Sequence, residues 1–433
     1  MLNKIARESG FVKRTPRKLT PRAFLEMMFF NVNEPQNQSL SDYSMDVYKN
    51  HGKEITKQSI SERFNESAVT FLKSLIKLQL DTQVDKLVEA LPIKGFKGIV
   101  VEDSTKFSLP DYMQDEFPGC GGVRNSTSML STHLRYELIH GHIEQLQINS
   151  GRVPDQQLAK DSIGQEKKEY LYLRDMGYFS LDFFENANDR EKGGYYYISR
   201  FKSNTSIFEK KDNQYYEMDL GDARNKLKSG QCNYLDLQVY IGKKKKIPTR
   251  IVITMAPEDV VEERLRKVNK QNKSHGCQTT EQYRMYAQLN IYITNLDMKY
   301  SPTDISRLYR LRWQIELIFK TWKSTYKLNR HKQVNPIRIK CQLYACLLLI
   351  LLHWEIFRPL TLMCFKSKGL WLSKLKFTKR LRLMLKEQRK WLRSTERETA
   401  TFIRTLYNEG LKFMTLEKRK KRENYSEIIR IFI

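Results

Sequence analysis

Four polar side chains recur at helical spacing in YRLRWQIELIFKTWK, residues 309–323. Counted from Tyr309 at about 100° per residue, Arg312, Glu316 and Lys323 fall with it in a stripe roughly 60° wide. An apolar stripe lies directly beside it and contains Leu308, Leu311, Ile315, Ile318, Phe319 and Trp322. We therefore predict one helix that packs on a core and holds a phenol, a guanidinium, a carboxylate and an ammonium at its border.

The same pattern has a simpler interpretation. Arg312 and Glu316 are four residues apart and can form a surface salt bridge worth about 0.2–0.5 kcal/mol. Lys320 falls near the same stripe, and helix geometry neither selects nor excludes it. The helix alone leaves a functional site and a solvated face equally open.

Two further carboxylates follow apolar strands. In GIVVEDST, alternation puts Val101 and Asp103 on one face of a strand and Glu102 on the other. In YLYLRDMGY, Leu173 and Asp175 share a face in the same way. Each Asp is predicted to end its strand before a turn, and open α/β sheets bind ligands beyond the carboxyl ends of their strands.

Asp103, Asp175 and Glu316 together offer hard oxygen ligands suited to Mg²⁺ or Mn²⁺. Two such ions roughly 4 Å apart can assist both the attacking and the leaving oxygen in phosphodiester chemistry. Either Asp alone would more often be a turn or cap residue. The third carboxylate, on a helix edge that also carries cations, favours a metal-dependent site acting on phosphodiesters.

The charge of the chain indicates a polyanionic partner. Lys and Arg number 76 against 49 Asp and Glu in 433 residues, a formal net charge of +27. Nucleic acid is the first candidate for such a surplus and an acidic membrane surface the second, with a basic protein lacking such a partner as the alternative. Residues 366–422 hold 19 Lys and Arg against 5 Asp and Glu. These helices are expected to grip phosphate backbones, unless they are only a solvated face.

The cysteines and apolar runs indicate a soluble, intracellular chain. Its six cysteines show no CxxC and no zinc-like spacing, which predicts reduced thiols. The first residues lack the apolar stretch of a signal peptide. The longest apolar run, CLLLILLHW at 346–354, is too short to span a bilayer and suits a buried helix.

The periodicity and composition of the sequence predict four regions. Residues 1–95 show helical spacing, and SLSDYSMDVYKNHGKEITKQSISERF is similar to a helix-turn-helix, with an ordinary helical bundle as the alternative. In the first interpretation Thr56 caps a second helix that carries Lys57, Gln58, Ser59 and Arg63. Residues 96–203 and 291–330 alternate strands and helices, as in an α/β core. Residues 204–290 form a β-rich insertion, and residues 331–433 are helical and basic.

The spacing of the polar stripe matches the YREK signature of DDE transposases of the insertion-sequence-four type. The matching residues are Tyr309, Arg312, Glu316 and Lys323. VVEDST resembles the segment around that family's first Asp, here Asp103, and LRDMGYF resembles the segment around the second, here Asp175. Glu316, which lies 141 residues after Asp175, matches the third acid. The likeness covers roughly residues 96 to 330.

The resemblance implies a fold and an activity. The fold is α/β, or multi-domain α+β overall: a ribonuclease-H-like mixed β-sheet core with a β-rich insertion, flanked by helical N- and C-terminal domains. The activity is that of a DNA transposase, which binds terminal inverted repeats and cleaves and transfers DNA strands. It implies two Mg²⁺ ions, or Mn²⁺ in their place, held by Asp103, Asp175 and Glu316.

The resemblance also implies roles for the residues around the acids. Tyr309, Arg312 and Lys323 would hold DNA phosphates, and Trp313 would stack on a displaced base unless it is simply a core residue. The N-terminal helices would bind the DNA ends, and the basic C-terminal helices would pair two protomers as a homodimer in the prokaryotic cytoplasm, at the nucleoid. The alternatives are a ribonuclease-H-fold nuclease that does not join strands and a catalytically silent DNA-binding relative.

Overall fold

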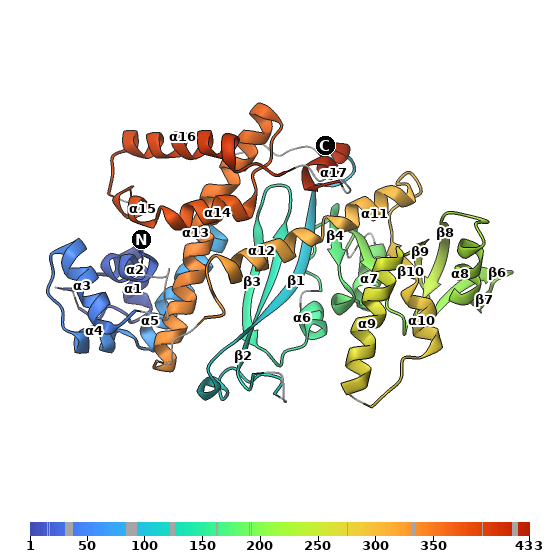
Figure 1. Cartoon of the computed structure of the whole chain (residues 1–433), viewed down its shortest axis with the longest axis horizontal. Helices are drawn as coiled ribbons and strands as arrows, with labels where there is room; N and C mark the ends of the chain where they lie inside the picture. The colour runs from blue at the N-terminus through green and yellow to red at the C-terminus, as the bar shows by residue number, and fades with distance from the viewer. Residues whose placement is uncertain are drawn as a thin grey trace.

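The computed structural model describes the chain except residues 15, 17, 31–37, 84–92, 122–125, 162, 190, 192, 275, 331–333, 392 and 418–422. Leu392 and the last five residues of the basic segment 366–422 therefore lie outside the described residues. The described strands form one ten-stranded sheet in the order β3-β2-β1-β4-β5-β10-β9-β8-β6-β7. Helices cover both of its faces and gather at one end (Figure 1).

The first five strands form the centre of the molecule. They are β1 (Gly98–Ser108), β2 (Met129–Glu137), β3 (Ile143–Ser150), β4 (Tyr170–Arg174) and β5 (Tyr196–Arg200). β2 is antiparallel to β1 and β3, whereas β4 is parallel to β1 and β5. This order with these directions is that of a ribonuclease-H-like core, and the predicted fold class is confirmed.

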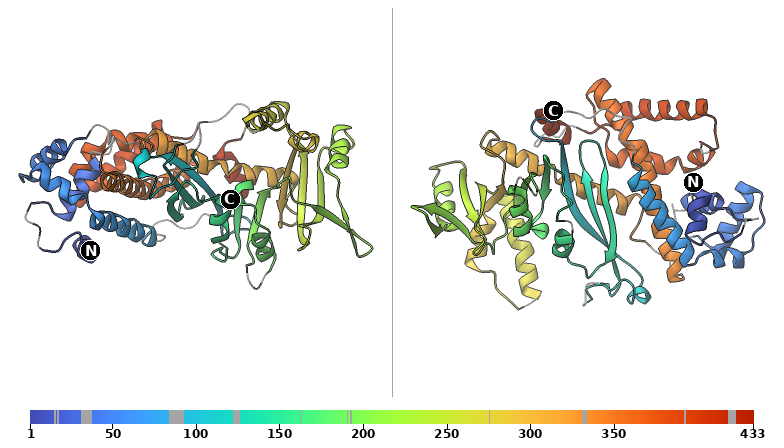
Figure 2. Two further views of the ribbon diagram at one scale, coloured as in Figure 1. Left: turned by 90° about the horizontal axis from the view of Figure 1, so that it is seen from below. Right: turned by 180° about the vertical axis from the view of Figure 1, so that it is seen from behind.

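The polar strands of residues 204–290 extend the same sheet. They are β6 (Ile207–Lys211), β7 (Gln214–Glu217), β8 (Leu235–Ile241) and β9 (Ile247–Met255), with α8 (Leu220–Lys228), α9 (Glu258–Ser274) and α10 (Glu281–Ala287). β10 (Leu289–Thr294) joins them to the core because it is antiparallel to both β5 and β9. The insertion thus lengthens the sheet at the end opposite to the N-terminal helices, as both views in Figure 2 show.

The remaining helices precede, connect and follow these strands. They are α1 (Leu2–Glu8), α2 (Pro21–Phe30), α3 (Leu40–His51), α4 (Lys57–Arg63), α5 (Glu66–Asp81), α6 (Asp155–Asp161), α7 (Leu181–Asn188), α11 (Pro302–Arg310), α12 (Trp313–Ser324), α13 (Pro336–Lys368), α14 (Lys374–Leu383), α15 (Leu385–Trp391), α16 (Glu396–Phe413) and α17 (Tyr425–Phe432). The described residues also form two short 3₁₀ helices, η1 (Asp111–Met113) and η2 (Met176–Tyr178).

Two-residue alternation along β1 sorts its side chains into two cores. Val101 packs in the larger core, which also holds Ile315 and Ile318 of α12. Val100 packs in the second core with Phe183 of α7. Because both faces are covered, the first part of the strand, Ile99–Val101, is apolar, and the polar residues that follow from Glu102 mark places where something other than packing is required.

Helix α13 is the central helix of the larger core. It is long and apolar enough to cross a membrane, but 72% of its most apolar window is buried inside the protein. The predicted buried helix at residues 346–354 is therefore confirmed as part of a much longer one.

The predicted helix-turn-helix segment folds as two helices with the expected boundaries. Gly52 ends α3 with a φ of 61°, which a residue without Cβ adopts at little cost. The Thr56 hydroxyl then accepts a hydrogen bond from the Ser59 amide and begins α4. Lys57 is exposed on α4, whereas Arg63 lies against Phe11. DNA recognition by this pair of helices stays a prediction.

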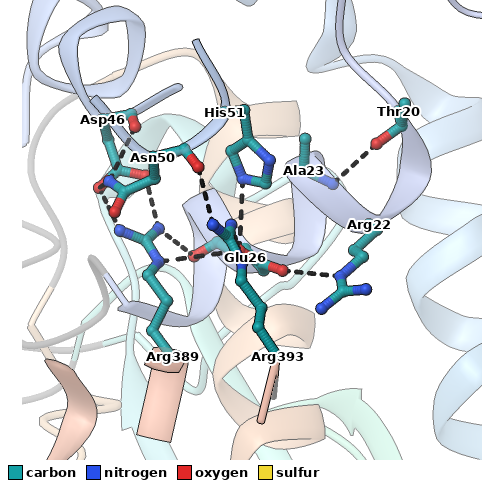
Figure 3. A network of polar contacts seen from close by, with 9 residues as sticks. All are labelled: Thr20, Arg22, Ala23, Glu26, Asp46, Asn50, His51, Arg389 and Arg393. Carbon is teal, nitrogen blue, oxygen red and sulfur yellow. Dashed lines mark hydrogen bonds and ion pairs between the residues drawn. The ribbon is translucent and has the colours of Figure 1, made fainter. Parts of the chain in front are cut away.

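The N-terminal helices are joined to the C-terminal helices by a cluster of charges (Figure 3). Buried Glu26 of α2 accepts hydrogen bonds from Arg22 Nε at 2.9 Å and from Arg393 Nη2 at 2.6 Å. Arg389 of α15 forms two hydrogen bonds, of 2.8 and 2.6 Å, with Asp46 of α3. Part of the basic surplus of residues 366–422 is thus neutralised inside the protein.

Candidate active site

The predicted helix over residues 309–323 is in fact two helices. α11 ends at Arg310 and α12 begins at Trp313. The amides of Leu311 and Arg312 donate to carbonyls three residues earlier, which is the tighter 3₁₀ pattern. The prediction of one continuous helix was wrong here, but the apolar stripe is buried as expected.

Asp103 lies within its strand and not at its end. β1 continues to Ser108 because it stays paired with β2, with Asp103 opposite Leu134. Its parallel pairing with β4 stops at Val101, so the backbone of β1 beyond that residue has left β4. The predicted strand end at Asp103 was wrong, whereas Asp175 does follow directly after β4, at the N-terminus of η2.

Arg312 connects two of the three predicted acids. Its Nη1 lies 3.2 Å from Asp103 Oδ2, and its Nη2 lies 2.5 Å from Glu316 Oε1. The salt bridge between Arg312 and Glu316 therefore exists, as the simpler interpretation required, with Arg312 directly before α12. The same guanidinium also reaches Asp103, which lies 209 positions away in the sequence.

Tyr309 contacts the third acid, Asp175. Its hydroxyl lies 3.3 Å from Asp175 Oδ1 and 3.3 Å from the carbonyl oxygen of Arg174. The side chain is 8% exposed, so the phenol faces the acids and not the surface. The phenol and the guanidinium on the α11–α12 segment thus hold acids from β1, from the end of β4 and from α12 around one place.

The electrostatics of this place show that negative charge is crowded there. Burial raises the pKa of Asp103 to about 6; Arg312 opposes the shift, and the charges of Asp175 and Glu316 add to it. Burial also raises the pKa of Glu316, again against Arg312 and together with the charge of Asp175. The acids are therefore near enough to oppose one another's ionisation, and a cation would relieve that repulsion.

A second layer of charges lies directly behind the acids. Glu102 is 1% exposed and forms an ion pair with Arg174, with Oε2 and Nη2 2.9 Å apart. The other oxygen of Glu102 lies 3.1 Å from His133 Nε2. Despite burial, Arg174 and His133 hold the pKa of Glu102 well below its usual range. This carboxylate is ionised and internally neutralised, which distinguishes it from its neighbour Asp103.

A cavity of about 510 Å³ opens beside Asp103 and Glu316. Lys323 lines it, with Nζ 5.2 Å from the ring of Phe107, and burial lowers the pKa of this lysine. Trp313 is 51% exposed and lines a different cavity, so the interpretation of Trp313 as a core residue was wrong.

The donor set fits a hard divalent cation, although Asp103 and Glu316 here are paired with arginine. In the described part of the chain, no three His, Cys, Asp or Glu side chains are arranged as a metal site. The guanidinium of Arg312 contacts both Asp103 and Glu316 and already supplies a positive charge there. Carboxylate oxygens that lie close together are nevertheless the ligands that Mg²⁺ and Mn²⁺ prefer.

Some residues around the site were not predicted from the sequence. Ser104 donates through its hydroxyl to Asp155 Oδ1 at 2.6 Å, which fixes the backbone next to Asp103. The charge of Lys267 on α9 opposes, as a minor contribution, the rise in the pKa of Glu316, so residues 204–290 bring a cation towards the site. No local pattern marks either residue, because both contacts come from distant segments.

Comparison with known proteins agrees with this geometry. A family model described as "Transposase DDE domain" matches residues 94–352. The transposase for insertion sequence element IS231E of Bacillus thuringiensis subsp. finitimus is 31% identical over 367 residues, which cover 81% of this chain and 76% of that protein. The transposase for insertion sequence element IS1151 of Clostridium perfringens is 31% identical over 371 residues, 82% of this chain and 77% of that protein.

Among solved structures, a similar chain is found in the cryo-EM structure of the piggyBac transposase synaptic complex with hairpin DNA. It is 10% identical, with a TM-score of 0.46 over 99% of this chain and 84% of that one. The sequence matches alone span most of the chain and include β1, β4 and α12. The chain therefore belongs to the DDE transposases of insertion sequences, enzymes that cleave DNA and transfer the cut strand.

Proposed function

We propose that Asp103, Asp175 and Glu316 carry out metal-dependent cleavage and strand transfer at the terminal inverted repeats of an insertion sequence. The observation that supports this most is the position of Arg312, whose guanidinium contacts Asp103 on β1 and Glu316 on α12. A surface salt bridge would need only Glu316. An arginine that also reaches a half-buried acid on a distant strand supports the proposal that Asp103 and Glu316 act in one site.

The three acids would hold two Mg²⁺ ions, or Mn²⁺ in their place. When bound, such ions stabilise the charge on the attacking and leaving oxygens of a phosphodiester. The protein's part is to supply ionised oxygens in fixed positions. Tyr309 fixes Asp175 through its hydroxyl, and the amide of Ser104 donates to Asp103 Oδ1 at 2.8 Å.

Arg312 and Lys323 would contact the phosphates of the cleaved strand. Lys323 lines the same cavity as Asp103 and Glu316 and has no carboxylate within ion-pair distance among the described residues. Arg312 would exchange its carboxylate partners for a phosphate once cations neutralise the acids. Tyr309, which is buried against Asp175, would reach a phosphate only through a shift of α11, and Trp313 is exposed enough to stack on a base.

The flanking regions would organise the DNA. We propose that residues 1–95 bind the ends and that residues 331–433 contact DNA and pair two protomers as a homodimer. Residues 96–203 and 291–330 would form the catalytic core, with residues 204–290 as its insertion. The enzyme would act in the prokaryotic cytoplasm, on the nucleoid.

The test uses DNA that carries the inverted repeats flanking this reading frame. Asp103→Asn, Asp175→Asn and Glu316→Gln should each abolish Mg²⁺-dependent cleavage and leave binding of the ends within about twofold of wild type. Asp182→Asn, which changes an exposed carboxylate on α7, is the control and should cleave normally. Cleavage that survives any one of the three substitutions removes that residue from the site.

The same assay separates the alternatives. A wild-type protein that cuts the ends but never joins them to a second DNA would be a nuclease on this fold. A wild-type protein that binds the ends and does not cut them with Mg²⁺ or Mn²⁺ would be a silent relative. Cleavage followed by joining supports the transposase mechanism proposed here.

A further inference from the structure

A second, larger cavity lies next to the site, on the side of the C-terminal helices. Its volume is about 1070 Å³, and we call it the C-terminal cavity. It lies between α12, the turn that joins β2 to β3, α14 and α17. Residues from these walls include Trp313, Lys320, Tyr136, His140, Lys374 and Tyr425.

Most of the cations that line the C-terminal cavity are neutralised by carboxylates. Arg310 lies 2.6 Å from Glu423, and Lys376 lies 2.7 Å from Glu417. Arg358 is likewise paired with a glutamate on its own helix. Their charges are therefore largely balanced before any ligand enters.

Lys374, the first residue of α14, is different. Within the described part of the chain, no carboxylate lies within ion-pair distance of its ammonium, and the one hydrogen-bond acceptor is Gln314 Oε1 at 3.4 Å. The rings of Tyr136 and Tyr425 lie 5.1 and 5.6 Å from Nζ. Two aromatic faces and an amide favour a cation but do not neutralise it.

This ammonium is also poorly hydrated. Burial lowers the pKa of Lys374 to about 7, far from the usual value for a lysine. Holding a desolvated positive charge without a counter-charge destabilises a folded protein. An anion that entered the adjoining cavity would supply the counter-charge that the described residues do not.

Lys320 connects this position to the acids. It is exposed on α12 and lines both the C-terminal cavity and the cavity of Asp103 and Glu316. It too lacks a carboxylate partner among the residues that the structure describes. Lys323, Lys320 and Lys374 therefore place three lysines without a described carboxylate partner along one route from the acids into the C-terminal cavity.

We propose that Lys374 binds a backbone phosphate of the DNA strand that passes the acids and enters the C-terminal cavity along α12. This inference rests on the proposed function, because it takes the anion to be the DNA that the acids cleave. It adds a binding site contributed by α14 and α17, outside the polar stripe of α11 and α12.

The first experiment measures lysine reactivity in the full-length protein at pH 7. An acylating reagent and mass spectrometry give the labelling rate of Lys374 with and without an inverted-repeat duplex, in EDTA. Lys374 should react readily in the free protein and at least fivefold more slowly with DNA. Lys379, on the same helix but exposed and not lining the cavity, is the control and should change by less than twofold.

An unchanged labelling rate of Lys374 would overturn the proposal. A further arm replaces the DNA with 10 mM inorganic phosphate. Protection by phosphate as strong as that by DNA would also overturn it, because the site would then take a free anion and not a strand.

The second experiment distinguishes contact from simple covering. The dependence of DNA affinity on salt should become shallower in Lys374→Met by about 0.7 to 0.9 in the double-logarithmic slope, as expected for the loss of one phosphate contact. Lys374→Arg should restore most of the wild-type slope, and Lys379→Met should leave the slope nearly unchanged. Equal slopes in wild type and Lys374→Met would show that the DNA only covers the lysine, which contradicts the proposal.

Two controls keep these results interpretable. Lys374→Met should unfold at the same or a higher temperature than wild type, because it removes a desolvated charge, so weaker binding cannot be ascribed to misfolding. Binding is measured without divalent cations and does not depend on cleavage. Failure of the Lys374 contact is therefore distinguishable from failure of the three acids to cleave.

Discussion

Arg174 and Glu102 form a buried ion pair, with Nη2 and Oε2 2.9 Å apart, one residue before Asp175 and Asp103. The backbone pairing of β1 with β4 ends at Val101 opposite Leu173. The ion pair thus continues the connection between the two strands by one residue where their hydrogen bonds stop. It holds together the backbones that carry two of the three acids.

Arg174→Met should therefore impair both stability and metal binding. Leaving Glu102 buried without this partner should cost about 3–5 kcal/mol in the free energy of unfolding, measured by urea denaturation. Arg250→Met is a matched control, because Arg250 is equally buried and pairs with Asp236 at 2.7 Å in the insertion. The control should lose stability and keep Mn²⁺ affinity. If Arg174→Met also kept that affinity, the pair would have no positioning role.

Arg312→Met should separate metal binding from catalysis. Without the guanidinium, Asp103 and Glu316 have no cation between them, so Mn²⁺ affinity at pH 8 should rise several-fold. Cleavage should nevertheless fall about 100-fold, because a cationic donor to the phosphate is lost. Calorimetric titration and a single-turnover cleavage assay measure the two effects. Weaker Mn²⁺ binding in this variant would mean that Arg312 supports the metal site and does not compete with it.

Metal affinity should depend on pH through Asp103. Its pKa of about 6 lies above the ordinary value of 3.8, so the folded protein holds this proton up to about pH 6. Mn²⁺ must displace it, and affinity should rise about tenfold per pH unit below 6 and level off above 7. For the same reason, Asp103 makes the metal-free protein less stable as pH rises from about 4 to 6. Asp103→Asn, followed by thermal unfolding without metal, should remove that part of the dependence.

Lys323→Ala should weaken cleavage of the ends more than general DNA binding. Its ammonium faces the cavity of the acids, so its loss should slow cleavage about tenfold, or 1.4 kcal/mol, and change the affinity for unrelated DNA by less than twofold. Lys299→Ala provides the comparison, since Lys299 is exposed and paired with Asp297. Equal losses in cleavage and unrelated binding would reduce Lys323 to a general phosphate contact.

The sequence was sufficient where packing follows a simple period. The two faces of β1, the buried stripe of α12 and the cap at Thr56 depend on neighbours within a few residues, and the structure agrees with each. These features needed only alternation, helical spacing and capping preferences.

The structure differs from the sequence predictions where contacts with distant segments decide the local conformation. No Pro or Gly marks the break before α12, and Arg312 at this break is held by Asp103 from a strand far away in the sequence. Similarly, β1 runs past Asp103 because β2 stays beside it. Lys374 is one of many basic residues in its segment, and only the folded chain shows that no carboxylate of the described residues pairs with it.

The ion pairs of Glu26 and Asp46 with α15 and Arg393 can form only late in the synthesis of the chain. A ribosome releases α2 and α3 long before it makes α15, so Glu26 and Asp46 must wait for Arg389 and Arg393. Until those arginines emerge, Arg22 and His51 are the charged partners that the N-terminal helices themselves offer Glu26, and its burial is less fully compensated. Chains that terminate before Arg389 would therefore lack the ion pairs that join the N-terminal helices to the C-terminal ones.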